Sequence, residues 1–326
     1  MSRYQQYCLT FKPLSTASKL PDAQTIFGAI CNIILYTQGQ ESFDKYIDSF
    51  NDMPLLIHSS MFPLKMLPMI KKNIFNVDYI NKNILLEQTK NQINYLQKMK
   101  QYKKINYVSY DVYKQYIELE NFNQLQDDLI KNNKVLVKDN CLIFENELAN
   151  NQTQIQMNTH VKKTGYYLNK NDEDSNDLYY DTALYFDKQS IYYIYVKTTL
   201  SIDQLKNIFK YSHYFGFGSR HSVGKNSFEL LTIEPVEYIN TSKHCLILSK
   251  SSLDDQFVLA DSYYQIESKL HRTSKFYLNN KLCNRINLFS EGSYLKINKS
   301  KEYYGNLLTF NIENKPLYYY AVGYAF

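Results

Sequence analysis

One segment organises this sequence: Tyr211-Ser-His-Tyr-Phe-Gly-Phe-Gly-Ser-Arg-His-Ser-Val-Gly-Lys-Asn-Ser-Phe228. It follows a predicted helix that opens with the capping box Ser201-x-x-Gln204, and it precedes a predicted strand at residues 228–238. Glycines let backbone N–H groups approach an anion, and cations and hydroxyls add charge and hydrogen bonds. We call residues 216–225 the glycine loop; its candidate phosphate-binding residues are Gly216, Gly218, Ser219, Arg220, His221, Ser222, Gly224 and Lys225.

The spacing of the loop excludes two familiar nucleotide-binding motifs. A Walker loop has four residues between its first glycine and the Gly-Lys-Ser/Thr, but five residues separate Gly218 from Gly224, and Asn226 follows Lys225. A dinucleotide fingerprint needs glycine at the position of His221 and runs from strand to helix, the reverse of the order here. A tight surface turn with incidental charge remains the alternative.

Outward from this segment, the pattern predicts a ferredoxin-like unit, the RRM architecture, in residues 1–239. Its order is strand, helix, strand, strand, helix, strand, once an insertion at about 63–177 is set aside. The insertion is rich in Lys, Asn and Tyr, lacks clean sheet alternation, and ends in an acidic stretch. The predicted elements are strands at 4–11, 55–62, 178–186, 191–198 and 228–238, a helix from Asp22, a helix from Ser201 to about 214, and short helices at 81–100 and 111–129 within the insertion.

Residues 240–326 are predicted to form a smaller second domain, with strands at 245–249, 307–312 and 317–324. No sequence repeat joins the two halves. The fold class is therefore α+β in two domains, the first of which carries the insertion and the glycine loop.

Composition limits the class of partner. The net charge is only +5, from 37 basic and 32 acidic residues, so any basic surface must be local. The five cysteines are odd in number, scattered and without a Cys-x-x-Cys pair, which favours a reducing cytoplasm and argues against structural zinc. No apolar run is long enough to cross a bilayer, so we expect a soluble, cytoplasmic protein without a membrane partner.

Two further segments without acidic residues flank predicted elements: the start of the chain, which has no acid before Asp22, and residues 62–77 after the second strand. In a ferredoxin-like unit these connections and the glycine loop emerge at one end of the sheet. Three basic loops that meet there predict local binding of nucleic acid. The candidate residues added by these segments are Lys12, Ser15, Thr16, Ser18, Lys19, Lys65 and Lys71.

The chain resembles a known family, the RAMP-superfamily subunits of type III-A (Csm) CRISPR complexes that cap the five-prime end of the guide RNA. The resemblance rests on a set of motifs that span nearly the whole chain in the expected order: Phe11-Lys-Pro-Leu-Ser-Thr, Asp22-Ala-Gln-Thr-Ile-Phe-Gly-Ala-Ile30, Phe62-Pro-Leu-Lys-Met-Leu-Pro68, Gly216-Phe-Gly-Ser-Arg-His-Ser-Val-Gly224 and Lys315-Pro-Leu-Tyr-Tyr-Tyr-Ala-Val-Gly-Tyr-Ala-Phe326.

The resemblance implies two RRM-like domains and a non-catalytic role. Such a subunit grips the repeat-derived five-prime handle of the CRISPR RNA (crRNA) with its glycine loop, and contacts the large Palm-domain subunit and the first backbone RAMP subunit. Its insertion carries a thumb that enters the guide–target RNA duplex. Here the thumb candidate is residues 157–165, with His160, Lys162 and Lys163 as contacts; Val161-Lys162 stands where the family more often has Asp-Arg.

Two other functions stay open at this level. His213 and His221 lie at the glycine loop, which keeps a metal-independent RAMP endoribonuclease that processes CRISPR RNA as an alternative. A free-standing RRM-type RNA-binding protein would stack bases on sheet tyrosines such as Tyr192, Tyr193 and Tyr195, although this strand lacks the glycine and charge of an RNP motif, and burial of these tyrosines against helices is favoured. No metal-ligand spacing or cofactor motif is found, so we expect no enzyme, metal or cofactor.

Overall fold

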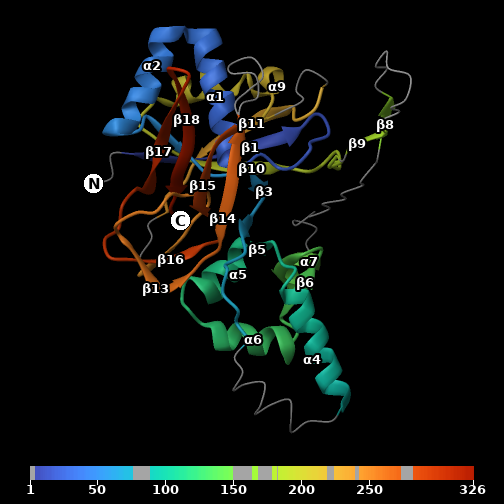
Figure 1. The fold of residues 1–326 in the computed structure, drawn as a ribbon. Coiled ribbons are helices and arrows are strands. Elements are labelled where there is room, and N and C mark those ends of the chain that lie inside the picture. Colours follow the sequence, from blue (N-terminus) through green and yellow to red (C-terminus); the bar gives the residue numbers. More distant parts are fainter. Residues whose placement is uncertain are drawn as a thin grey trace.

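The computed structural model describes residues 4–75, 89–149, 164–167, 178–181, 183–218, 224–238, 242–272 and 282–326. The architecture is mixed α+β with several sheets (Figure 1). A main sheet with helices on one face forms the upper part of the view, and a lobe made by the insertion lies below it. In the described part of the chain, no helix is both long and apolar enough to cross a membrane.

The main sheet has the order β11-β1-β10-β2, and the short β3 also pairs with β10. Strands β1 and β10 are antiparallel neighbours at its centre, the arrangement of the predicted ferredoxin-like unit, with Leu9 opposite Ile194. The predicted strand at 55–62 is split into β2 and β3 by the intervening residues 59–61. The bounds are β1 Gln5–Pro13, β2 Leu56–His58, β3 Phe62–Pro63, β10 Tyr192–Thr198 and β11 Phe228–Pro235.

Two predicted helices start where their caps indicated. Helix α1 (Ala23–Gln38) begins after Asp22, whose carboxylate accepts the N–H of Thr25, and it buries seven residues that include all its isoleucines. Helix α8 (Ile202–Phe209) has the complete capping box of Ser201 and is followed by the short α9 (Ser212–Phe215). Phe11 of β1 packs edge-on against Phe209, with the ring centroids 6.0 Å apart, which attaches α8 to the sheet. Helix α2 (Gln40–Asp48) and a 3-10 turn (Ser49–Asn51) lead back to β2.

The insertion forms a lobe with its own sheet, of order β4-β5-β7-β6, in which β5 and β7 are parallel. The sequence predicted short helices here but no strands, because strands of three or four residues are too short to show a clean alternating pattern. The elements of this lobe are β4 Met66–Pro68, α4 Thr89–Tyr102, β5 Tyr107–Ser109, α5 Tyr110–Val112, a π-helical turn Tyr113–Ile117, α6 Phe122–Ile130, β6 Val135–Lys138, β7 Cys141–Phe144 and α7 Glu145–Ala149.

The strand predicted at 178–186 is shorter and does not join the main sheet. It ends at Asp181 as β9 (Leu178–Asp181), which pairs with β8 (Thr164–Tyr167) as an antiparallel hairpin. Farther along, Leu184 makes an isolated bridge with Ala17, in the loop after β1.

The C-terminal part consists of strands, and the described residues of 242–326 include no helix, so they lack the two helices of the RRM-like unit that the resemblance implied for this half. It forms the sheet β12-β16-β13 and the hairpins β14–β15 and β17–β18. The predicted strands at 245–249, 307–312 and 317–324 correspond to β12, β17 and β18. The bounds are β12 His244–Leu246, β13 Phe257–Tyr263, β14 Ile266–Arg272, β15 Leu282–Phe289, β16 Tyr294–Ile297, β17 Tyr303–Ile312 and β18 Lys315–Tyr324.

These C-terminal strands cover one face of the main sheet. Tyr195 of β10 stacks on Tyr324 and Phe326, with centroids 6.1 and 5.5 Å away, and Tyr193 is fully buried beside it. The expected burial is confirmed for Tyr192 and Tyr193, and Tyr195 is half-buried. Alternate residues of a strand face opposite sides of its sheet, so the C-terminal part covers Tyr195, whereas Tyr192 packs on the other face against Phe186 and Phe228 rather than against helices. The open aromatic sheet face of a free-standing RRM protein is therefore absent along this described strand.

Candidate RNA-binding surface

The described ends of the glycine loop have the backbone geometry that glycine provides. Gly216, Gly218 and Gly224 have φ values of 63°, 123° and 79°, in the region that side chains rarely adopt. The stem is closed by the N–H of Phe217, which donates to the carbonyl of Asn226 at 2.8 Å. Phe217 is buried against Phe11, with centroids 5.6 Å apart, so the core holds the base of the loop.

A seam of hydrogen bonds joins the loop after β1 to the end of the glycine loop. Asn226 donates its N–H to the Thr16 carbonyl at 2.8 Å, and its Oδ1 accepts the N–H of Ser18 at 3.3 Å. Ser227 donates its N–H to Ser15 Oγ at 3.0 Å and accepts the N–H of Leu14 at 2.9 Å. The predicted meeting of these two segments is therefore confirmed.

Asn226, which had no predicted role, is the centre of this seam. Its φ is 62° and its side chain is buried, so an asparagine takes a conformation that usually needs glycine while its amide bonds another loop. An asparagine directly after Gly-Lys was the available signal, since asparagine is enriched at positive φ.

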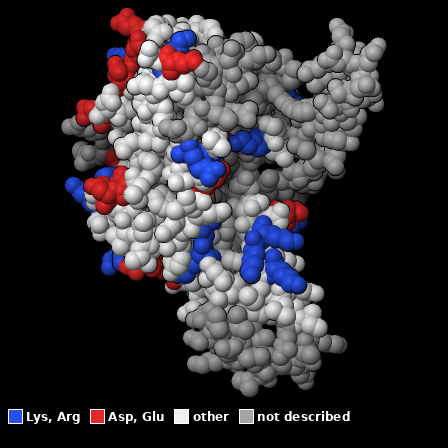
Figure 2. Space-filling model, in the orientation of Figure 1, with Lys and Arg blue, Asp and Glu red and all other residues white. Residues whose placement is uncertain are grey.

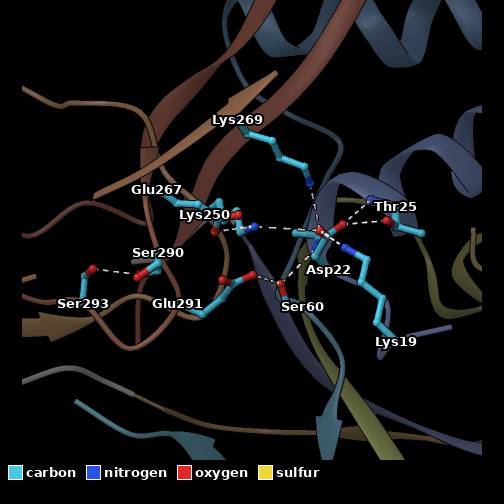
Figure 3. Close-up of polar contacts among 11 residues, drawn as sticks. Lys19, Asp22, Thr25, Ser60, Lys250, Glu267, Lys269, Ser290, Glu291 and Ser293 are labelled. Atoms are coloured by element: carbon cyan, nitrogen blue, oxygen red, sulfur yellow. Dashed lines mark hydrogen bonds and ion pairs between the residues drawn. The ribbon is translucent and has the colours of Figure 1, made fainter. Parts of the chain in front are cut away.

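Lys19 and Asp22 form an ion pair of 2.7 Å at the start of α1 (Figure 3). The other oxygen of Asp22 accepts from Thr25 N at 3.0 Å and Thr25 Oγ1 at 2.6 Å. Burial opposes ionisation of Asp22, but the charges of Lys19 and Lys269 and these hydrogen bonds outweigh it and hold the pKa of the carboxyl well below its usual value. A Cβ added at Gly218 would lie 3.1 Å from Thr25 Cγ2, so the glycine loop touches this cluster.

Only the start of the third acid-poor segment, residues 62–77, lies near the other two loops in the described part of the chain. Just before it, the Met61 N–H donates to the Pro21 carbonyl at 3.0 Å. Lys65 lies in the turn between β3 and β4, at φ 61°, and its carbonyl accepts the N–H of Tyr110 in the inserted lobe. Lys71 donates its N–H to the carbonyl of Gly292 at 3.1 Å, which places it against the C-terminal part.

The remaining predicted residues divide into described and undescribed ones. Lys12 lies on β1, opposite Glu229 of β11, and Gly224 and Lys225 begin the return from the glycine loop. His213 of α9 accepts the hydroxyl of Ser227 on its carbonyl at 2.8 Å, and its ring lies 3.8 Å from that of Tyr214. Outside the described residues are the loop candidates Ser219, Arg220, His221 and Ser222 and the thumb candidates His160, Lys162 and Lys163.

Positive charge on this side of the molecule comes from more than the predicted loops. Figure 2 shows Lys and Arg side chains gathered across the middle of the face, over and beside β14, while Asp and Glu lie mostly along one edge. Lys250 and Lys269 belong to the same cluster as Lys19 (Figure 3), and neither was among the predicted site residues. No local pattern signals them, because they lie more than 200 residues from Asp22.

Comparison with known proteins gives a match at the level of fold. No model of a protein family matches the chain, and a search of characterised proteins found no related sequence. A chain of the crystal structure of the Csm3-Csm4 subcomplex in the type III-A CRISPR-Cas interference complex is 15% identical, with coverage of 96% of this chain and 98% of that chain and a TM-score of 0.58.

Chains of the Csm1-Csm4 cassette, solved with pppApA and with AMPPNP, are 14% identical, with coverage of 98% of this chain and 96% of theirs and TM-scores of 0.51 and 0.50. The resemblance predicted from the motifs is thus confirmed as a similarity of architecture. Over almost its whole length, this chain has the fold of a subunit found in type III-A CRISPR assemblies that contain Csm4.

Proposed function

We propose that this chain is the RNA-binding end subunit of a type III-A CRISPR effector complex, where it holds the five-prime handle of the crRNA and cleaves no RNA. The observation that carries the proposal is the seam at Asn226 and Ser227, which fixes two acid-poor loops beside each other. A site built in this way offers backbone N–H groups and lysines to a phosphate chain, without a metal or cofactor.

The loop geometry suits single-stranded RNA that is gripped by its backbone. Positive φ at Gly216, Gly218 and Gly224 turns the backbone in directions that a regular helix or strand does not permit. Lys225 follows directly, and Arg220 and Ser222 complete the candidate loop in the sequence. Contacts to phosphates and backbone position a fixed RNA segment, and their energy depends on salt.

The partners are proposed from the assemblies that share the fold. Csm3 and Csm1 accompany Csm4 in the structures with TM-scores of 0.50 or more. We therefore assign this chain one neighbour of the backbone RAMP type and one large Palm-domain neighbour. Its first half then acts as an RRM-like domain, and residues 157–165 of the insertion act as the thumb on the guide–target duplex.

Sequencing of the RNA that co-purifies with the full chain tests the RNA assignment. A uniform population that shares one short five-prime handle supports it, whereas mixed RNA or none overturns it. With that RNA, Arg220→Gln and Lys225→Gln should each reduce the slope of log affinity against log salt by about 0.7, the value for one phosphate contact on a single strand. Lys45→Gln is the matched control, since Lys45 is an exposed residue of helix α2, and it should leave the slope unchanged.

Two further experiments test the absence of catalysis and the role of the thumb. Repeat RNA incubated with the pure chain should stay intact, and cleavage lost in His213→Ala or His221→Ala would establish the endoribonuclease instead. A chain without residues 157–165 should still capture the large subunit and handle RNA in a pull-down. It should disturb base pairing of the target RNA with the guide next to the handle. The assembly proposal would be contradicted if the natural chain captured neither the large Palm-domain subunit nor the backbone RAMP subunit in a pull-down.

A further inference from the structure

Three lysine ammonium groups converge on a single carboxylate oxygen at the start of α1. The Nζ atoms of Lys19, Lys269 and Lys250 lie 2.7, 3.4 and 3.9 Å from Asp22 Oδ2 (Figure 3). Lys19 comes from the loop after β1, Lys250 from the segment after β12, and Lys269 from β14, so the C-terminal part supplies two of the three. We call Lys19, Lys250, Lys269 and Asp22 the lysine cluster.

The accessible side of this cluster is cationic. The side chain of Asp22 is 10% exposed and that of Lys250 is 11% exposed, whereas Lys269 is 33% and Lys19 is 58% exposed. A molecule that approaches from solvent therefore meets the ammonium groups of Lys19 and Lys269 before it meets the carboxylate. The same carboxylate holds both groups at one place, which lowers the entropy lost when they bind a shared ligand.

The charges of the cluster do not cancel. Lys250 also pairs with Glu267 at 2.7 Å, so three lysines share two carboxylates and one positive charge remains in excess. Glu291 is bound by Ser60 Oγ at 2.7 Å, and the charge of Lys71 lies close to it. When Glu291 and Lys71 are included, one positive charge still remains in excess, and an anion can neutralise it.

The cluster is continuous with the glycine loop. Asp22 Oδ1 accepts from Thr25, and Thr25 Cγ2 is the nearest atom to the position that a Cβ would take at Gly218. Ser18, the residue before Lys19, is bound through its N–H to Asn226 at the other end of the same loop. An RNA backbone that leaves the glycine loop on this side therefore passes Lys19 and Lys269.

We propose that Lys19 and Lys269 form a phosphate-binding pair for the same RNA, so that the C-terminal strands take part in holding the handle. Each ammonium has three N–H donors and gives one to Asp22, which leaves donors for a phosphate oxygen. Lys250 and Asp22 are positioning residues, because they are mostly covered and hold the pair in place. The inference rests on the proposed function for the identity of the ligand and adds a contact from the second half of the chain.

Salt-dependent binding of the co-purified handle RNA, in its single-stranded form, by the full chain tests the pair. Lys19→Gln and Lys269→Gln should each reduce the slope of log affinity against log salt by about 0.7, and the double variant by about 1.4. Lys296→Gln is the matched control: Lys296 lies on β16 of the same half, is 35% exposed and pairs with one carboxylate, Asp261, at 2.6 Å. It should leave the slope unchanged.

A second measurement uses the natural chain, so it does not depend on whether a variant folds. Handle RNA should protect Lys19 and Lys269 of the natural chain from an amine-reactive reagent and leave Lys296 labelled. Unchanged slopes in the variants, or equal labelling with and without RNA, would show that the lysine cluster only joins the two halves of the chain and binds no RNA. Mixed co-purified RNA, or none, would instead refute the proposed function, so the two failures are distinguishable.

Discussion

His58 makes the stability of this protein depend on pH between neutral and mildly acidic conditions. The imidazole is fully buried and stacks on Tyr320, with ring centroids 4.5 Å apart. Its Nδ1 lies 3.2 Å from the Ser59 carbonyl, and Nε2 has no hydrogen-bond partner in the described structure. A second proton on the ring would therefore be a buried, unpaired charge.

The magnitude follows from the pKa. Burial lowers the pKa of His58 from 6.5 to about 4, against a smaller opposite effect of the Ser59 hydrogen bond. Between these values the unfolded chain takes up a proton that the native chain refuses, so the free energy of unfolding falls as pH falls from 6.5 towards 4. The loss between pH 7.5 and pH 5 is about 2 kcal/mol from this group alone.

Urea unfolding at the two pH values, with two variants, isolates this effect. His58→Phe keeps an aromatic ring for the stack but has no titrating group, so its loss of stability between pH 7.5 and pH 5 should be smaller by about 2 kcal/mol. Tyr320→Phe is the control: it removes the hydroxyl that bonds the N–H and carbonyl of His58, at 2.9 and 3.2 Å. It should lower stability at both pH values by roughly 1–3 kcal/mol and keep the pH dependence.

The reasoning would be refuted if the natural chain and His58→Phe lost equal free energy over this pH range. That result would mean that His58 accepts a proton in the folded state. The imidazole could not then be sealed between β2 and β18, and the packing of the C-terminal strands on the main sheet would need revision.

The other predictions concern backbone geometry and a cap. Gly292→Ala should destabilise the protein by several kcal/mol in urea unfolding, because φ is +84° and a Cβ would lie 2.2 Å from the carbonyl oxygen of Met69; normal stability would contradict that close approach. Ser201→Ala should cost about 1 kcal/mol in the same assay, since the capping box is complete, and no loss would mean that the cap is not formed. Gly218→Ala should weaken binding of handle RNA while the protein stays folded by circular dichroism, because φ is +123° and the new methyl would press on Thr25; unchanged affinity would remove this glycine from the site.

The amino-acid sequence determined the local elements and the meeting of two loops. Asp22 and the isoleucines at helical spacing placed the start and buried face of α1, and the capping box at Ser201 placed α8. These signals act over one or two turns of chain, so they survive without tertiary information. The order of strands then placed the loops after β1 and after α9 at one end of the sheet, where Asn226 now joins them.

Tertiary structure alone decided what lies on that sheet and what surrounds Asp22. The sheet of the inserted lobe could not be predicted, because strands of three or four residues carry too little periodicity. The cover of Tyr195 could not be predicted either, because Tyr324 comes from almost the far end of the chain. The same holds for Asp22, which the sequence identified as a helix cap and the fold made the centre of three lysines. Local patterns could not specify the contacts of Asp22 with Lys250 and Lys269, because those contacts form only when the two halves of the chain pack together.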